Sequence, residues 1–391
     1  MTRLLFGRLA LIFVSLTLSL SLLEIGLRLF APQPVVFFDL GEIYRYDEEL
    51  GYTLEPNATS LSAGITINSH GLRDYEVSLA KPAGTFRILA LGDSYTFGAG
   101  HIDSIYPKVL RRLLAAALPG GPPIQVISAG FPGWGTDEET VWLERDGLDF
   151  EPDVVVLGFY VGNDVHDNRV LGPLVPVAGK LVKREQATRY DSRWGRLTLE
   201  VVARAHRSHL YRFVTRRMAG ISLPEATPWQ GVKDQSTEFK PITDRMMDIY
   251  AWRMNVFLVE GAEKWVDRAW QETRVWLRRL ESILEERGIP LLVFIIPEQL
   301  QVNPRLEDRL IDKLGEAKAK AFRIDLPQKR LIEILESEGI AYLDVLTAFR
   351  ERGRDEMLYH PENAHWNPAG NDLGARLLLA ELQRRSLVPK P

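Results

Sequence analysis

Five short apolar runs, separated by stretches with helical periodicity, constrain the fold more than any other feature of this sequence. The runs lie at residues 86–91, 125–128, 154–159, 291–296 and, more weakly, 341–345. Short, nearly continuous apolar runs are typical of parallel strands that are buried on both faces. Helical patterns accompany them at about 103–118, 136–148, 264–287, 318–338 and 369–384. The alternation predicts an α/β fold, with a parallel sheet between two layers of helices.

The sheet pattern lapses between about residues 170 and 262. A segment of this length is too long for a plain loop, so we interpret it as a mostly helical insertion. Its first part is rich in lysine and arginine. The simplest interpretation is a solvated helix face. The alternative is a surface that contacts anionic lipid headgroups or an acidic glycan.

The N-terminus is the second informative stretch. No charge occurs from Leu9 to Leu23, and apolar residues continue to Phe30, interrupted by Glu24 and Arg28. Because a bilayer span needs about 20 apolar residues, a helix from about Leu4 to Phe30 is long enough to cross a membrane.

Arg3 and Arg8 precede this apolar segment and favour an N-terminus inside the cell. We therefore expect an uncleaved signal anchor over residues 1–30, with the rest of the chain outside the cytoplasm, in the periplasm or at the cell exterior. A cleaved signal peptide and a buried helix are the alternatives. We expect a juxtamembrane linker with short β elements over residues 31–84. The main domain then covers residues 85–388 and contains the insertion.

Composition excludes several classes of function. The 391-residue chain has no cysteine, which rules out disulfides, thiolate catalysis and cysteine-ligated metals. A net charge of −4 gives no reason to expect nucleic-acid binding. We expect no metal and no organic cofactor.

The strongest local motif is Gly92-Asp93-Ser94, directly after the first apolar run. Ligands of parallel α/β sheets bind at the carboxyl ends of strands, so the Ser94 hydroxyl is placed where chemistry usually occurs. Gly92 allows the sharp turn. Capping of the following helix is the other interpretation of these residues.

Two further polar, glycine-containing turns follow the next two strands. The first is the segment from Gly130 to Gly135, where a backbone N–H can point at a developing oxyanion. The second is Gly162-Asn163-Asp164, where the amide of Asn163 can donate to the same oxyanion. Each also has a turn-only interpretation.

Near the C-terminus, His365 precedes a helical pattern. A histidine opposite a strand-end serine fits a general base, which needs a neutral imidazole near pH 7. An acid orients the second ring nitrogen of such a histidine, and Glu362 is the nearest candidate.

Together these motifs resemble the SGNH/GDSL hydrolase family, in particular its membrane-anchored bacterial esterases. The resemblance implies a flavodoxin-like α/β/α sandwich with five parallel strands. It also implies that Ser94 is the nucleophile and His365 the base, and that Ser94, Gly133 and Asn163 form the oxyanion hole. Two departures stand out. Val161 and Gly162 replace the usual start of the third motif, and Glu362 and Asn363 stand where relatives carry the aspartate of the triad.

The resemblance favours hydrolysis of carboxylic esters through an acyl-enzyme. The substrate would be an envelope glycan, a lipid or a small ester. Two alternatives remain open at this point: O-acyl transfer to an envelope polysaccharide, and a non-catalytic binding or assembly role on the same scaffold.

Overall fold

The structure is a computed structural model, which describes residues 2–31, 35–37, 43–60, 63–168, 174–177, 180–183, 208–218, 247, 254–259, 261, 263–303, 305–360 and 364–390. The chain divides into two compact units. One comprises Met1–Gly71 with Gly172–Pro228, and the other Leu72–Leu171 with Trp229–Pro391. We call them the N-terminal unit and the sheet unit. The boundaries inferred from the sequence at residues 30, 84 and 388 stay predictions.

The sheet unit contains a five-stranded parallel sheet in the order β12-β11-β8-β6-β7. Its strands are β6 (Phe86–Gly92), β7 (Ile124–Gly130), β8 (Val154–Tyr160), β11 (Leu291–Ile296) and β12 (Tyr342–Asp344). All five apolar runs therefore form strands of one sheet. β8 and β11 are buried at every residue, as expected for central strands covered on both faces.

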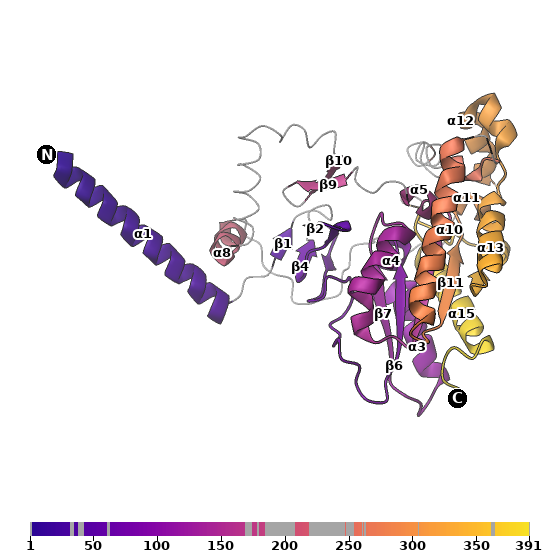
Figure 1. Ribbon diagram of the computed structural model, residues 1–391, viewed down its shortest axis with the longest axis horizontal. Coiled ribbons are helices and arrows are strands. Elements are labelled where there is room, and N and C mark those ends of the chain that lie inside the picture. The colour runs from indigo at the N-terminus through magenta and orange to yellow at the C-terminus, as the bar shows by residue number, and fades with distance from the viewer. Residues whose placement is uncertain are drawn as a thin grey trace. The chain divides into compact units, whose positions relative to one another are not determined.

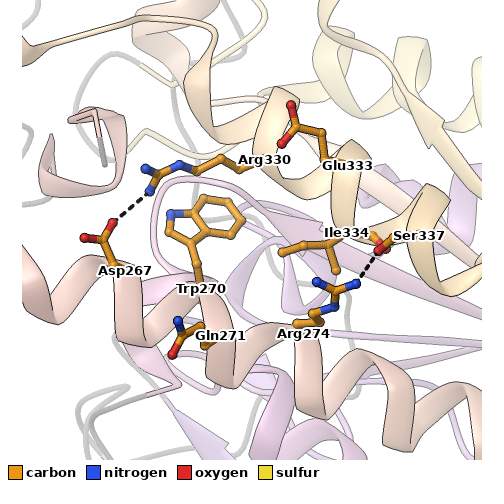
Figure 2. A pocket seen from close by; sticks show the side chains of 8 residues that line it. All are labelled: Asp267, Trp270, Gln271, Arg274, Arg330, Glu333, Ile334 and Ser337. Carbon is orange, nitrogen blue, oxygen red and sulfur yellow. Dashed lines mark hydrogen bonds and ion pairs between the residues drawn. The ribbon is translucent and has the colours of Figure 1, made fainter. Parts of the chain in front are cut away.

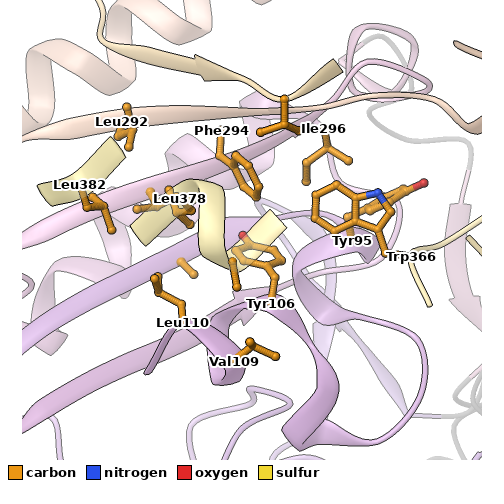
Figure 3. Packing of buried hydrophobic residues seen from close by; sticks show 14 of the residues in the cluster. Tyr95, Tyr106, Val109, Leu110, Leu292, Phe294, Ile296, Trp366, Leu378 and Leu382 are labelled. Atoms are coloured by element: carbon orange, nitrogen blue, oxygen red, sulfur yellow. The ribbon is translucent and has the colours of Figure 1, made fainter. Parts of the chain in front are cut away.

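Helices cover both faces of this sheet (Figure 1). On one face, α3 (Tyr106–Ala117) packs against α15 (Pro368–Arg384) over a cluster that contains Phe294 and Trp366 (Figure 3). On the other face, α4 (Thr136–Arg145) packs against α10 (Lys264–Glu285). The three-layer α/β/α sandwich predicted from the sequence is confirmed.

The remaining helices of the sheet unit are short or peripheral. They are α2 (Ser94–Phe97), η2 (Ile102–Ser104), η3 (Gly147–Phe150), α5 (Asp164–Asp167), η5 (Met254–Phe257), α11 (Gln299–Val302), α12 (Arg305–Ala321), α13 (Leu326–Glu338) and α14 (Leu346–Arg352). The sequence predicts one helix over 318–338, but the structure divides this region between α12 and α13. Pro327 explains the division, because proline fits the first turn of a helix but not its interior.

The N-terminal unit contains α1 (Thr2–Phe30), α8 (His209–Met218) and short strands. The strands are β1 (Val35–Phe37), β2 (Tyr44–Asp47), β3 (Gly51–Leu54), β4 (Ala58–Ser60), β5 (Ile65–Thr66), β9 (Leu174–Val177) and β10 (Lys180–Lys183). β9 and β10 form an antiparallel pair inside the predicted helical insertion, so its described part combines strands with α8. The apolar span predicted at the N-terminus is helical, and Phe6–Phe30 is long and apolar enough to cross a membrane.

Arg73, in the segment before β6, supports the turn that follows α2. Its buried guanidinium donates a hydrogen bond of 2.8 Å to the carbonyl of Phe97 and further bonds to the carbonyls of Gly98 and Gly100. Burial lowers the pKa of Arg73 to about 10, which leaves the group charged at neutral pH. One side chain therefore donates hydrogen bonds to three carbonyl groups that accept none within a helix or strand.

The next residue, Asp74, links β7 to α3. It accepts the N–H of Ser128 on β7 at 2.8 Å and forms an ion pair with Lys108 on α3. Both charged side chains are only 4% exposed. Such a pair is costly to break, because each buried group would lose its opposite charge in a region that is shielded from water.

We expect Asp74→Asn to lower the free energy of unfolding by about 3–5 kcal/mol, because it leaves the Lys108 ammonium buried without a counter-charge. Urea unfolding followed by tryptophan fluorescence measures the change. The matched control is Asp372→Asn, which breaks an exposed pair with Arg376 and is expected to cost less than about 1 kcal/mol. Equal effects of the two substitutions would contradict this account of the Asp74–Lys108 pair.

Candidate active site

Ser94 lies at the sharp turn between β6 and α2. It is the first residue of α2, and the carboxylate of Asp93 caps this helix by accepting the N–H of Tyr95 at 2.8 Å. Gly92 is required at the strand end. A Cβ there would lie 2.9 Å from the carbonyl oxygen of Gly158 on β8 and closer still to the Thr96 hydroxyl. The turn therefore combines the two interpretations of the motif: Asp93 caps the helix, and Ser94 is half-buried beside it.

His365 lies in a hairpin-like loop between α14 and α15. The loop is closed by a bridge between Tyr359 and Trp366 and by a hydrogen bond of 2.7 Å from the N–H of His360 to the carbonyl of His365. Trp366 is 1% exposed and belongs to the core, and Asn367 caps α15 by accepting the N–H of Gly370 at 3.0 Å. The core and the helix cap thus fix the histidine from its C-terminal side.

The structure brings Ser94 and His365 together. The Nε2 atom of His365 lies 2.9 Å from the Ser94 Oγ, although the two residues are 271 positions apart in the chain. The Ser94 hydroxyl also lies 3.3 Å from the Asp93 carboxylate. The shorter distance favours the bond to His365, and a histidine whose Nδ1 carries the proton can accept it through Nε2.

Tyr95, the neighbour of the serine, touches the histidine loop directly. Its ring centroid lies 5.0 Å from that of His365, and its hydroxyl donates to the carbonyl of Ala364. Ala364 has a positive φ of 59°, which is unfavourable for a residue with a Cβ and needs support from its surroundings. Tyr95 therefore holds the backbone next to His365 in place.

Gly133 lies three residues beyond the end of β7. The last residues of β6 and β7, Gly92 and Gly130, are paired, so the turn with Gly133 starts beside the turn with Ser94. Gly133 has a φ of 82°, which favours glycine. Among the described residues, the backbone N–H groups of Ser94 and Gly133 donate no backbone hydrogen bond. The oxyanion-hole role of these two groups stays a prediction.

Asn163 follows β8 and is buried, and its amide is already engaged. The Nδ2 atom donates to the Asp167 carboxylate, and the amide also forms a hydrogen bond with the Asp93 carboxylate. Asp164, the next residue, accepts the N–H of Tyr160 at 2.8 Å and so closes the turn. Donation to an oxyanion requires the Asn163 amide to direct an N–H bond at the substrate, so this role stays a prediction.

Glu362, the candidate third member of the triad, lies outside the described residues, as does Asn363. Its role in orienting the imidazole of His365 stays a prediction. Glu298, after β11, is placed: it caps α11 and accepts a hydrogen bond from the Tyr160 hydroxyl. Its role is structural.

A group of buried carboxyl side chains, which no sequence pattern indicated, surrounds the Ser94 turn. Its members are Asp93, Asp137, Glu138, Glu139 and Asp164, and the half-buried Asp167 adjoins them. Burial, opposed by hydrogen bonds and reinforced by the charge of Asp167, raises the pKa of Asp93 to about 6. Burial and then the charges of Asp93 and Glu138 raise the pKa of Glu139 well above its ordinary value. Among the described residues, these acids form no cluster suited to a metal ion.

A separate pocket lies between α10 and α13, and it contains neither Ser94 nor His365 (Figure 2). Arg330 lies 3.5 Å from Asp267 there, and Arg274 donates to the Ser337 hydroxyl at 2.7 Å. These pairs hold the two helices together, and we assign the pocket no part in the chemistry.

Comparison with known proteins places the chain in a family. A sequence model of the GDSL-like lipase/acylhydrolase family matches residues 90–373, which include Ser94, Gly133, Asn163 and His365. The match covers more than half of the chain. The protein therefore belongs to this family of hydrolases, as its motifs indicated. No curated protein matches the chain.

Solved structures with a distant likeness include a lipase/acylhydrolase from Enterococcus faecalis. It is 15% identical, with 77% of this chain and 96% of that chain covered and a TM-score of 0.35. A catalytic mutant of an acetylxylan esterase from Geobacillus stearothermophilus is 14% identical, with 76% and 94% covered and a TM-score of 0.40. The family assignment rests on the sequence match alone.

Four residues that belong to the site or support it were not predicted from the sequence: Arg73, Asp74, Tyr95 and Glu139. Asp74 and Arg73 lie in a region that we interpreted as a linker, and no periodicity distinguishes them. Glu139 lies in an acidic first turn of α4, which is ordinary helix chemistry. Tyr95 adjoins Ser94 in the motif, and only its distance from His365 reveals its function.

We expect Tyr95→Phe to lower kcat for ester hydrolysis by about 10-fold, because loss of one buried hydrogen bond weakens the support of the Ala364 backbone by about 1–2 kcal/mol. The ring that contacts His365 remains. Initial rates over a range of substrate concentrations separate kcat from KM. Tyr342→Phe is the control, since that hydroxyl bonds the exposed Glu336. An unchanged kcat would remove Tyr95 from the positioning of His365.

The buried carboxyl groups predict a stability that falls as the pH rises. A carboxyl whose pKa is higher in the folded than in the unfolded state binds a proton on folding. Its stabilising contribution is complete below the unfolded pKa and is lost as the pH rises through the folded pKa. For Asp93 this window runs from its ordinary value of 3.8 to about 6, and for Glu139 it extends higher.

Glu139→Gln tests this interpretation, because both Glu139 carboxyl oxygens are buried without a hydrogen-bond partner among the described residues. Urea unfolding at pH 5 and pH 8 is the measurement. The wild-type protein should lose stability between these values, and the variant should lose less, by about 1–3 kcal/mol. Glu333→Gln, at an exposed position on α13, should leave the pH dependence unchanged. The same pH dependence in all three proteins would refute a proton held by Glu139.

Proposed function

We propose that the protein hydrolyses carboxylic esters with Ser94 as nucleophile and His365 as general base. The observation that supports the proposal most strongly is the 2.9 Å contact between the Ser94 Oγ and the His365 Nε2. A nucleophile and a base within hydrogen-bond reach are the minimum that acyl transfer to serine requires. The same contact argues against a purely non-catalytic scaffold.

The reaction follows from this geometry. His365 accepts the proton of Ser94 as Oγ attacks the ester carbonyl, and the resulting imidazolium then protonates the leaving alkoxide. The product of this half-reaction is an acyl-enzyme on Ser94. In the second half, His365 accepts a proton from water as the water oxygen attacks the acyl carbonyl. The imidazolium then returns this proton to the Ser94 Oγ as the bond to the acyl group breaks and the carboxylic acid leaves. No step calls on a metal or an organic cofactor.

The developing oxyanion needs hydrogen-bond donors at the carboxyl ends of the strands. We assign this role to the N–H groups of Ser94 and Gly133 and to the amide of Asn163. The role of the two backbone groups is supported by their position in turns that follow the paired ends of β6 and β7. Asn163 joins them when its amide turns from the Asp167 and Asp93 carboxylates towards the substrate.

We propose further that α1 anchors the protein in a membrane. Its apolar side chains are exposed from Phe6 to Leu23, for example Phe13 at 71% and Leu11 at 72%. A helix of 29 residues is about 43 Å long, more than the hydrocarbon core of a bilayer requires. Arg3 and Arg8 orient its N-terminus inwards, so the hydrolase acts outside the cytoplasm. Acyl esters of envelope glycans or lipids are the substrates that such a location offers.

The acyl-enzyme can be tested with the full-length chain in mild detergent and p-nitrophenyl acetate as substrate. Ser94→Ala and His365→Ala should each lower kcat/KM by about 10³-fold or more, because nucleophile and base act as one unit. Ser282→Ala, at an exposed position on α10, is the control and should be fully active. Turnover that persists in Ser94→Ala would exclude the proposal.

The same assay addresses the third member of the triad. If Glu362 orients His365, Glu362→Gln should lower the rate by about 10²–10⁴-fold, whereas an unchanged rate removes Glu362 from the mechanism. Adding polysaccharide acceptors separates hydrolysis from O-acyl transfer, since a transferase would release p-nitrophenol faster and form an acylated sugar.

A further inference from the structure

Glu24, near the end of α1, holds the start of α8. Its carboxylate accepts the backbone N–H groups of His209 at 3.0 Å and Leu210 at 2.7 Å, which are the first two residues of α8. It also accepts the Ser208 hydroxyl at 2.8 Å and the Arg28 guanidinium at 2.7 Å. A carboxylate at a helix N-terminus satisfies otherwise free N–H groups and complements the helix dipole. The start of α8 is therefore attached to α1 at the position of Glu24.

Glu24 marks the end of the apolar segment of α1. The residues from Leu4 to Leu23 rise about 30 Å as a helix, which is the thickness of the hydrocarbon core of a bilayer. Glu24 is the first acidic residue after them. In a membrane-anchored chain, Glu24 and the start of α8 thus lie at the boundary between acyl chains and headgroups.

α8 itself has the pattern of an interfacial helix. Tyr211, Val214 and Met218 are exposed, Met218 at 83%, and their i, i+3, i+7 spacing places them on one face of the helix. The ten-residue sequence carries three arginines and no acidic residue. The guanidinium of one of them, Arg217, lies 5.4 Å from the ring centroid of Phe213. An apolar stripe on a basic helix is typical of segments that lie in the plane of an anionic membrane surface.

We propose that α8 binds the membrane surface beside the anchor. Tyr211, Val214 and Met218 insert among the lipids, and Arg217 binds the anionic headgroups of the leaflet from which α1 emerges. The proposal rests on the membrane anchoring proposed above. Charge complementarity and the continuity of α8 with the apolar helix select lipid as the occupant of the exposed stripe. The protein then touches the membrane with two helices, one that spans it and one that lies on it.

The absence of cysteine from the chain allows single labels to test this. A polarity-sensitive fluorophore is attached to Met218→Cys, Leu16→Cys or Glu286→Cys in the full-length chain. The protein is reconstituted in vesicles of phosphatidylcholine with 30% phosphatidylglycerol, which contain lipids spin-labelled on the acyl chain. Quenching of at least 2-fold is expected at positions 16 and 218. Little quenching is expected at 286, which is exposed at the end of α10.

The two proposals fail in different ways in this experiment. Quenching at position 16 without quenching at 218 leaves the anchor intact and overturns the proposal for α8. No quenching at either position overturns both. A fluorophore at 218 that is shifted to the blue but not quenched by the lipids is covered by protein, which also overturns the proposal.

Charge is tested in the Met218→Cys background. Replacing Arg212, Arg216 and Arg217 together by glutamine should lower the quenching in phosphatidylglycerol vesicles to its level in neutral vesicles. The matched control replaces Arg376, Arg384 and Arg385 on and after α15, which removes the same charge elsewhere. Equal quenching in neutral and anionic vesicles would overturn the binding of anionic headgroups.

Glu24→Ala tests the attachment of α8 to α1. It removes the acceptor of both α8 N–H groups, so quenching at position 218 should fall by at least 2-fold while quenching at position 16 persists. Unchanged quenching at position 218 would show that α8 reaches the membrane without Glu24. This result would contradict the proposal that Glu24 on α1 holds α8 at the membrane surface.

Discussion

The hydrogen bond between Ser94 and His365 depends on two rigid supports that meet at the carboxyl edge of the sheet. On the serine side, β6 ends at a glycine that approaches β8 closely, and Asp93 starts α2 at once. On the histidine side, Trp366 is buried in the core and Asn367 fixes α15. A contact between residues so far apart in the chain persists only because the sheet and one helix layer position both ends.

Tyr95 connects these two supports. It belongs to α2, and its hydroxyl bonds the backbone of Ala364, so the serine turn and the histidine loop are coupled by a side chain next to the nucleophile. The buried acids add a second constraint. Burial, and after it the charges of neighbouring carboxylates, raises the pKa values of Asp93, Glu139 and Asp164. The Ser94–His365 contact itself is set by packing.

The sequence predicted the parts of the structure that depend on local pattern. The five apolar runs became the five strands, and the glycines after β6 and β7 marked the turns that lie beside Ser94. The helix predicted over residues 318–338 was wrong in detail, because Pro327 lies in the first turn of a separate helix, α13. Arg73, Asp74 and Tyr95 act through contacts with distant segments, and such contacts leave no periodic trace in a sequence. The β9–β10 pair was missed because this segment lacks apolar runs like those of the main sheet, and its length led us to expect helices.

The central claim is that His365 activates Ser94. Treatment of the full-length protein with a fluorophosphonate, followed by mass spectrometry of its peptides, tests it directly, because only an activated serine displaces the fluoride. The account predicts one phosphonyl adduct, on the peptide that contains Ser94, and its loss in His365→Ala. An adduct on another serine, or an equal yield without the imidazole, would contradict it.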